Sequence, residues 1–211
     1  MDEQKGEKVT AQRPAWNTIH QAGGKVYVTG ANIASFAADI LDLEINCEIN
    51  KKEAQKMHSN KHKIVLYHNP QAGVENPEIY RRNYGLGVWL ANYDGNMNYN
   101  YSSSFNHAWN DFDHPKYRDH NFTYPTINGA IDTIAWEGYR EGIKDIKYAT
   151  TLRLEMEKFR KGPDLQKAEL VKRIDKWFEF LTLENRNLDT IRLEIINFIL
   201  LLKNTSQGRI Q

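Results

Sequence analysis

The stretch AWEGYREGIKDIKY, residues 135–148, predicts a long helix with an unusual packing surface. Its apolar and small residues lie on one stripe at helical spacing, which extends in both directions: Ile131, Ala135, Gly138, Gly142, Ile146, Ala149, Leu152 and Met156. Gly138 and Gly142 would each cost the helix about 1 kcal/mol relative to alanine. Two glycines one turn apart therefore indicate that another backbone packs closely there.

The opposite face of this helix carries charges at matching spacing. Glu137 and Arg140 are three residues apart, as are Glu141 and Lys144, so each pair can interact on the helix surface. We therefore expect the two glutamates to make structural ion pairs rather than to form a catalytic pair.

Upstream of this helix, residues 25–92 alternate between strand-like and helix-like segments. Short apolar runs bounded by glycine, proline or polar residues predict strands at 25–29, 43–49, 62–68 and 85–91. Helical spacing or charge predicts helices at 33–41, 51–59 and 77–82. Alternation of this kind predicts parallel βαβ units with right-handed crossovers.

The remaining segments set the domain organisation. Residues 1–22 form a polar tail, 23–160 the main domain with a long aromatic loop at 93–130, and 161–211 a helical hairpin. Gly162-Pro163-Asp164 ends the long helix and caps the next one. Apolar residues at helical spacing then predict helices around 171–181 and 188–202.

Composition restricts the class of protein. The 211 residues include 40% apolar residues, enough for a core, and their net charge of +1 gives no general attraction to nucleic acid. A single cysteine, Cys47, excludes an internal disulfide and is expected to be a small core residue. No stretch approaches the about 20 apolar residues of a membrane span.

The order of Tyr124-Pro125-Thr126 and residues 135–148 resembles the end of the catalytic domain of glycoside hydrolase family 123. That family carries a W-E-x-x-R-E-G-I-x-D-x-x-Y signature after a "YP" loop, and the resemblance covers roughly residues 25–155. It implies a sugar-cleaving (β/α)-barrel. Ala135, Lys144 and Ile146 depart from the usual form, which affects the expected substrate specificity more than the fold.

Three or four strands cannot close a barrel, which takes eight. The expected fold is therefore α/β: the last three or four strand–helix units of an incomplete TIM-type (β/α)8 barrel, followed by a C-terminal helical segment. The polar tail would mark a truncation or a late start. The partner expected on this interpretation is the missing N-terminal part of the barrel.

In a (β/α)-barrel the ligand lies at the carboxyl ends of the strands. The predicted strands end near Thr29, Asn32, Asn46, His68, Asn69, Asn92, Tyr93 and Asp94. Amides and carboxylates hydrogen-bond sugar hydroxyls, and aromatic rings can stack on a pyranose. The expected glycan-binding residues are therefore Asn69, Trp89, Asn92, Tyr93, Asp94, Trp109 and Tyr124.

The resemblance also implies a mechanism, in which terminal β-linked N-acetylhexosamine is cleaved with help from its own acetamido oxygen. An adjacent Asp-Glu pair on an earlier strand orients that group and protonates the leaving oxygen. Asp2-Glu3 is the one such dipeptide here, and no strand precedes it. We therefore expect a fragment without a catalytic residue, inactive by itself. The resemblance alone implies that the protein is secreted or periplasmic, and the chain shows no signal peptide.

No cofactor or metal is expected. Residues 94–98 alternate oxygen ligands as a calcium loop does, but Tyr99 replaces its glycine and Phe105 its glutamate. The cluster His107, Asp111, Asp113, His114 and His120 lacks recognised zinc spacing.

Two alternatives remain open. The chain could be a non-catalytic carbohydrate-binding or structural protein that kept the aromatic loop. It could also be a self-standing α/β protein whose helical tail covers the open sheet edge and binds a partner.

Overall fold

The computed structural model describes residues 6–67, 76–116 and 118–204, and it divides into two compact units, Met1–Gly142 and Ile143–Gln211. The first unit holds a four-stranded sheet, a β-hairpin and short helices. The second is helical. The long helix α7 (Ile134–Phe159) contributes residues to both units.

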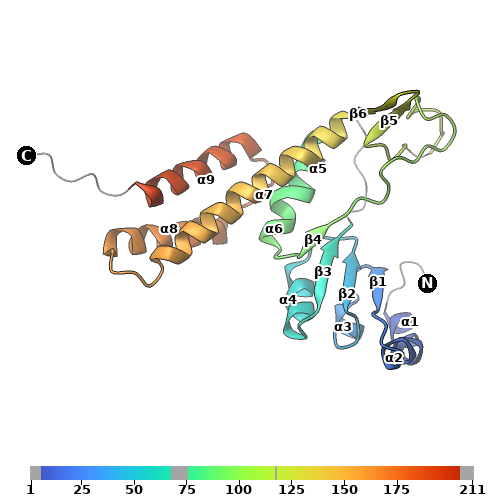
Figure 1. The fold of residues 1–211 in the computed structure, drawn as a ribbon, viewed down its shortest axis with the longest axis horizontal. Helices are drawn as coiled ribbons and strands as arrows, with labels where there is room; N and C mark the ends of the chain where they lie inside the picture. The colour runs from blue at the N-terminus through green and yellow to red at the C-terminus, as the bar shows by residue number, and fades with distance from the viewer. Residues whose placement is uncertain (1–5, 68–75, 117, 205–211) are drawn as a thin grey trace, which may run out of the picture. The chain divides into compact units, whose positions relative to one another are not determined.

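The sheet of the first unit is entirely parallel. Its strands follow chain order, as Figure 1 shows: β1 (Tyr27–Gly30), β2 (Leu43–Asn46), β3 (Lys63–Leu66) and β4 (Gly95–Asn96). Helix α3 (Ala34–Ala37) follows β1, and α4 (Lys51–Ser59) follows β2. The predicted alternation of parallel strands and helices is confirmed for this part of the chain. Whether further strands close a barrel stays a prediction.

The two faces of the sheet differ in burial. In-register residues of parallel strands share a face, and successive residues alternate between faces. Two rows on one face lie mainly buried under the helices. They are Val28, Glu44 and Ile64, and Gly30, Asn46 and Leu66. The intervening rows are more open: Tyr27 is 68% exposed, and Leu43, Thr29 and Val65 are half-buried, whereas Ile45 is buried. Parallel sheets are usually covered on both faces, so this open face is unusual.

The segment 1–22, which the sequence predicts to be a polar tail, contains two helices. They are α1 (Glu7–Thr10) and α2 (Arg13–Gln21), and Val9 and Trp16 join the hydrophobic core of the first unit. Arg13 makes a bidentate ion pair with Asp39. This segment is therefore part of the folded unit.

The prediction of a strand at 85–91 is wrong. The chain there is helical: α5 (Pro77–Arg82), the π-helix η1 (Asn83–Gly87) and α6 (Val88–Leu90). A short apolar run fits a buried strand or a buried helix equally well, and here η1 is buried along its whole length. The last strand of the sheet is instead β4, two residues long, inside the predicted loop 93–130.

The rest of that loop leads into an antiparallel hairpin, β5 (Thr123–Thr126) and β6 (Gly129–Asp132), directly before α7. Along α7, a Cβ on Gly138 would lie 2.1 Å from the carbonyl oxygen of Pro77. A Cβ on Gly142 would lie 2.7 Å from that of Arg81. The prediction that these glycines admit another backbone is confirmed, and the backbone is that of α5.

The second unit consists of the end of α7, α8 (Leu165–Phe180) and α9 (Leu188–Lys203). Asp164 caps α8 by accepting a hydrogen bond from the Lys167 amide, as the sequence predicts. The buried Asp145 carboxylate of α7 receives the Arg192 guanidinium of α9 at 2.5 Å. Within the described residues no helix has both the length and the apolar character needed to span a bilayer.

Candidate functional site

Polar and aromatic side chains collect where the four parallel strands end. Because parallel strands end at the same edge of a sheet, the segments that follow them meet there, and ligand sites commonly form at such an edge. We call this set the carboxyl-edge cluster: Asn32, Asn46, Glu48, Asn50, Tyr67, Asn96, Asn98 and Tyr99.

Asn32 organises the half of the cluster that follows β1 and β2. It adopts a left-handed conformation, with φ 57°, which asparagine tolerates better than most residues. Its amide nitrogen donates to Glu48 Oε2 at 2.8 Å. Its amide oxygen accepts from Asn50 Nδ2 at 2.7 Å and, more weakly, from Asn46 Nδ2 at 3.4 Å. Three side chains are thus held around one amide, with the exposed Glu48 carboxylate at the surface.

Asn96, the last residue of β4, and Asn98, two residues later, form part of the other half. Asn96 Nδ2 donates to the carbonyl oxygen of Tyr84 at 2.8 Å, and its Oδ1 accepts from the Tyr139 hydroxyl at 2.5 Å. The Tyr84 hydroxyl in turn donates to Asn98 Oδ1 at 3.1 Å. Burial raises the pKa of Tyr139, so its hydroxyl keeps the proton that it donates. Both asparagines are therefore fixed by tyrosines of the first unit, the buried Tyr84 and the half-buried Tyr139.

Two aromatic rings lie beside these asparagines. Tyr67 follows β3 and Tyr99 follows β4, and their ring centroids are 5.8 Å apart. Tyr99 is 59% exposed, so one ring remains accessible beside the polar groups. An accessible ring next to amides can bind a pyranose, with stacking on the apolar face and hydrogen bonds to the hydroxyls.

The predicted residues Asn92, Tyr93 and Asp94 precede β4 rather than follow a strand. Asp94 Oδ2 accepts from the amide of Ile64, near the start of β3, and lies 3.0 Å from His58 Nε2. Asn92 Nδ2 contacts the same imidazole at 3.2 Å. Both side chains therefore belong to the amino edge of the sheet, because the assumed strand at 85–91 is helical. Their part in binding stays a prediction.

Tyr93 is buried, and its hydroxyl contacts only backbone in the hydrogen bonds that the structure describes. It donates to the carbonyl oxygen of Glu48 at 2.7 Å and accepts from the Asn50 amide at 3.1 Å. Burial raises the pKa of Tyr93. The hydroxyl thus supports the loop after β2, which carries Glu48 and Asn50 of the carboxyl-edge cluster.

Three of the other predicted residues also have a described environment. Trp89 lies half-buried on α6. Trp109 is 51% exposed and stacks on Tyr124, with centroids 5.2 Å apart and planes 16° apart. The Tyr124 hydroxyl donates to the buried Asp111, which also accepts from Asn121 Nδ2 at 3.1 Å. Asn69, and the Asp2-Glu3 dipeptide, lie outside the described residues.

The sequence did not single out Glu48, Asn96 or Asn98 as binding residues. Asn32 and Asn46 were placed at strand ends from the sequence alone, and the structure confirms those positions. A usable signal for Asn96 and Asn98 was their position two residues apart in a polar segment after the last apolar run. Among the described residues, no three His, Cys, Asp or Glu side chains are grouped closely enough to hold a metal ion.

Comparison with known proteins gives one family. A family model described as "Glycoside hydrolase 123, catalytic domain" matches residues 1–152. No curated protein matches the chain. The matched range includes the whole sheet, the carboxyl-edge cluster, the hairpin and most of α7.

Proposed function

The chain belongs to the glycoside hydrolase 123 catalytic-domain family, and from that premise we propose that it binds glycans through its carboxyl-edge cluster as part of a glycoside hydrolase. The observation that carries the proposal is the position of this cluster. Asn32, Glu48, Asn96 and Tyr99 lie where parallel α/β folds bind their ligands, and they offer the groups that sugars require.

We further propose that β1 to β4 form part of a barrel. Helices cover one face of the sheet, whereas the opposite face has exposed or half-buried positions at Tyr27, Leu43 and Val65. In a closed barrel that face would lie inside, packed against the side chains of other strands. β1 and β4 each have only one neighbouring strand among the described residues, which leaves both edges free to extend the sheet.

The proposed reaction is hydrolysis of a terminal β-linked N-acetylhexosamine, in which the substrate's acetamido oxygen attacks the anomeric carbon. The role of this chain is to bind and orient the sugar. Asn32 and Asn96 hydrogen-bond hydroxyls, Glu48 accepts from a hydroxyl, and Tyr99 stacks on the ring. We assign no catalytic acid to this chain, so turnover requires an acid supplied from elsewhere in the barrel.

Trp109 and Tyr124 form a second proposed contact with the glycan. The Trp109 ring is supported on one face by Tyr124, and Tyr124 is anchored through Asp111. A ring that is held in place and half exposed can stack on a sugar without first losing rotational freedom. This stacked pair, which we call the aromatic platform, would contact a sugar of the glycan beyond the terminal one.

Binding by the full chain tests the proposal. Isothermal titration with a β-linked N-acetylhexosamine disaccharide would be compared for the wild type, Asn96→Ala and Tyr99→Ala. Matched controls at the amino edge of the sheet are Asn60→Ala and Tyr27→Ala, both at exposed positions. The cluster variants should weaken binding at least about 10-fold, the loss of about 1.4 kcal/mol, and the controls should not.

Release of nitrophenol from a nitrophenyl β-N-acetylhexosaminide tests whether the isolated chain hydrolyses a substrate as well as binding it, and release would contradict the absence of a catalytic acid. Binding without release supports a sugar-binding part of an enzyme or a non-catalytic carbohydrate-binding protein. Equal loss of affinity in cluster and control variants, or no binding by the wild type, would contradict the proposed site.

A further inference from the structure

Two glutamates are buried side by side on the helix-covered face of the sheet. Glu44 lies in β2 with no exposed surface, and Glu53 lies in α4 with 2% exposed. They accept hydrogen bonds from consecutive backbone amides at the start of α3. The Ile33 amide donates to Glu44 Oε1 at 3.3 Å, and the Ala34 amide donates to Glu53 Oε2 at 2.8 Å.

The two carboxyls are unequally compensated. Glu53 also accepts from the Lys56 ammonium at 3.0 Å, so both of its oxygens have donors. Glu44 Oε2 is buried and has no hydrogen-bond partner in the described part of the chain. A negative charge on Glu44 would therefore depend on one long hydrogen bond beside a second carboxyl, whereas a proton on Glu44 removes that charge.

The groups around Glu44 do not offset this imbalance. Burial, and then the Glu53 carboxyl, raise the pKa of Glu44 to about 8. Lys56, on α4, acts in the opposite direction and is the smallest of these effects. The Tyr93 hydroxyl faces the pair from the segment before β4, and Cys47 faces Tyr93 from the loop after β2. None of these groups adds a second positive charge. One proton therefore stays on the pair at neutral pH.

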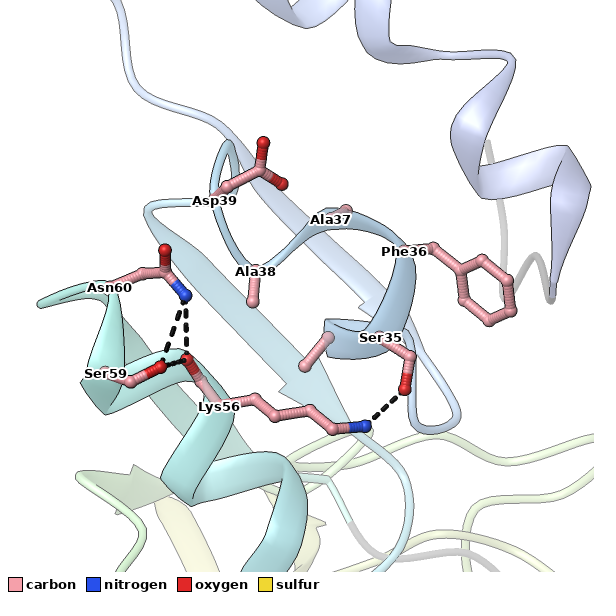
Figure 2. Close-up of a pocket in the computed structure, with 9 residues that line it drawn as sticks. Ser35, Phe36, Ala37, Ala38, Asp39, Lys56, Ser59 and Asn60 are labelled. Carbon is pink, nitrogen blue, oxygen red and sulfur yellow. Dashed lines mark hydrogen bonds between the residues drawn. The ribbon is translucent and has the colours of Figure 1, made fainter.

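An open hollow of about 410 Å³ lies between α3 and α4, close to Glu53. Its lining includes Ala34, Ser35 and Lys56, and Figure 2 shows the Lys56 ammonium directed at the Ser35 hydroxyl, to which it donates. The same ammonium contacts Glu53. Lys56 thus connects the surface of the hollow to the buried pair.

We propose that Glu44 and Glu53 form a proton-controlled latch on the segment 32–34, which joins the carboxyl-edge cluster to α3. With one proton bound, both carboxyls hold the Ile33 and Ala34 amides. Loss of that proton places two charges in one buried site, and Glu44, the less compensated, moves away from the Ile33 amide. Asn32, the adjacent residue, then loses its fixed position.

The latch rests on contacts of Glu44, and its consequence for glycan binding rests on the proposed function. The first test therefore uses no glycan. Carbon-13 labelling of the glutamate side chains and nitrogen-15 labelling of the full chain allow the Glu44 carboxyl and the Ile33 and Ala34 amides to be titrated together by NMR. The expected midpoint is above pH 7 for all three signals.

Two variants make the result specific. Glu44→Gln keeps the shape and removes the titration, so the Ile33 and Ala34 amide shifts should become independent of pH from 6 to 9. Glu53→Gln removes the like charge, and the Glu44 midpoint should fall by about one pH unit or more. If Glu44→Gln does not fold, the Glu44 midpoints of the labelled wild type and of Glu53→Gln still test the latch.

A wild-type Glu44 midpoint below pH 6 would overturn the latch, as would a midpoint that Glu53→Gln leaves unchanged. If the latch is present, the affinity of the wild type for the disaccharide should fall as pH rises from 7 to 9, and Glu44→Gln should abolish that dependence. A latch without an effect on affinity would contradict its regulatory role and leave the proposed binding site standing.

Discussion

Gly85 and Gly142 pack backbone to backbone: a Cβ on Gly85 would lie 2.8 Å from the Cα of Gly142. Gly85 also departs from helical geometry, with φ −104° and ψ −114°, which interrupts η1 at the point of contact. The helix α7 therefore approaches the η1 backbone more closely than any side chain would permit. The glycine of the "REG" part of the signature has this steric role.

Gly142→Ala should destabilise the protein by about 2 kcal/mol, since the new methyl meets backbone that cannot move aside. The better helix propensity of alanine, worth about 1 kcal/mol, offsets only part of the clash. Urea unfolding measures the change. Gly162→Ala serves as control because its nearest contact would be an ordinary 3.4 Å, and equal midpoints for the two variants would refute the packing role.

The stability of the first unit should depend on pH through Glu44. Its pKa is raised from 4.5 to about 8 on folding, so the folded state holds the proton more tightly than the unfolded state. The contribution of Glu44 to the free energy of unfolding is therefore largest below about pH 4.5 and falls as pH rises toward 8, by on the order of 4 kcal/mol at most. Urea unfolding at a series of pH values should show this slope in the wild type and a flatter one in Glu44→Gln.

The Asp145–Arg192 pair should be the most costly ion pair to break in the helical unit. Asp145 is 1% exposed, so Asp145→Asn removes a buried negative charge that binds the Arg192 guanidinium and should cost about 3 kcal/mol. Thermal unfolding followed by circular dichroism measures the loss. Glu169→Gln breaks an exposed pair on α8 and should change stability by less than about 0.5 kcal/mol. Similar losses in both variants would contradict the ranking.

Tyr139→Phe should separate orientation from packing at Asn96. The phenyl ring retains the contacts with Trp136 and Phe122, and only the hydrogen bond to Asn96 Oδ1 is lost. We expect a stability cost of about 1 kcal/mol and a several-fold loss of disaccharide affinity. Tyr101→Phe, at a ring that is 59% exposed, is the matched control for titration calorimetry. Unchanged affinity in Tyr139→Phe would remove Asn96 from the proposed site.

Trp109→Ala should weaken binding of an extended glycan without changing stability, because the ring is half exposed and packs mainly on Tyr124. Stacking on one sugar is expected to contribute about 1 kcal/mol, comparable to an aromatic pair, and so roughly a fivefold change in Kd. Phe112→Ala controls for aromatic content, since Phe112 lies in the same loop and is 61% exposed. The platform is ruled out if a tetrasaccharide binds both variants equally.

The sequence predicted the elements whose signals are local. The bounds predicted for α4 and α5, residues 51–59 and 77–82, match the structure, and so does the Asp164 cap. The prediction was wrong at residues 85–91, where the choice between strand and helix depends on burial against a distant glycine, Gly142. β4 was missed because two polar residues carry no periodicity, and its pairing with β3 is a tertiary contact.

The same limit applies to the site. Asn32 and Asn46 could be placed at strand ends because β1 and β2 were predicted correctly. Asn92 and Asp94 were assigned to the wrong edge because that assignment depended on the strand at 85–91. The Glu44–Glu53 pair had no signal in the sequence, since the two residues meet only when α4 packs on β2.

The packing along α7 has a consequence for how activity is inferred in this family. In this chain Gly138 and Gly142 admit neighbouring backbone, and Asp145 binds an arginine of another helix. None of these roles involves a substrate. A protein with this packing that had lost all hydrolytic activity would still need the two glycines for the same steric reason. The signature therefore sorts sequences by architecture, and competence for catalysis has to be read from other positions.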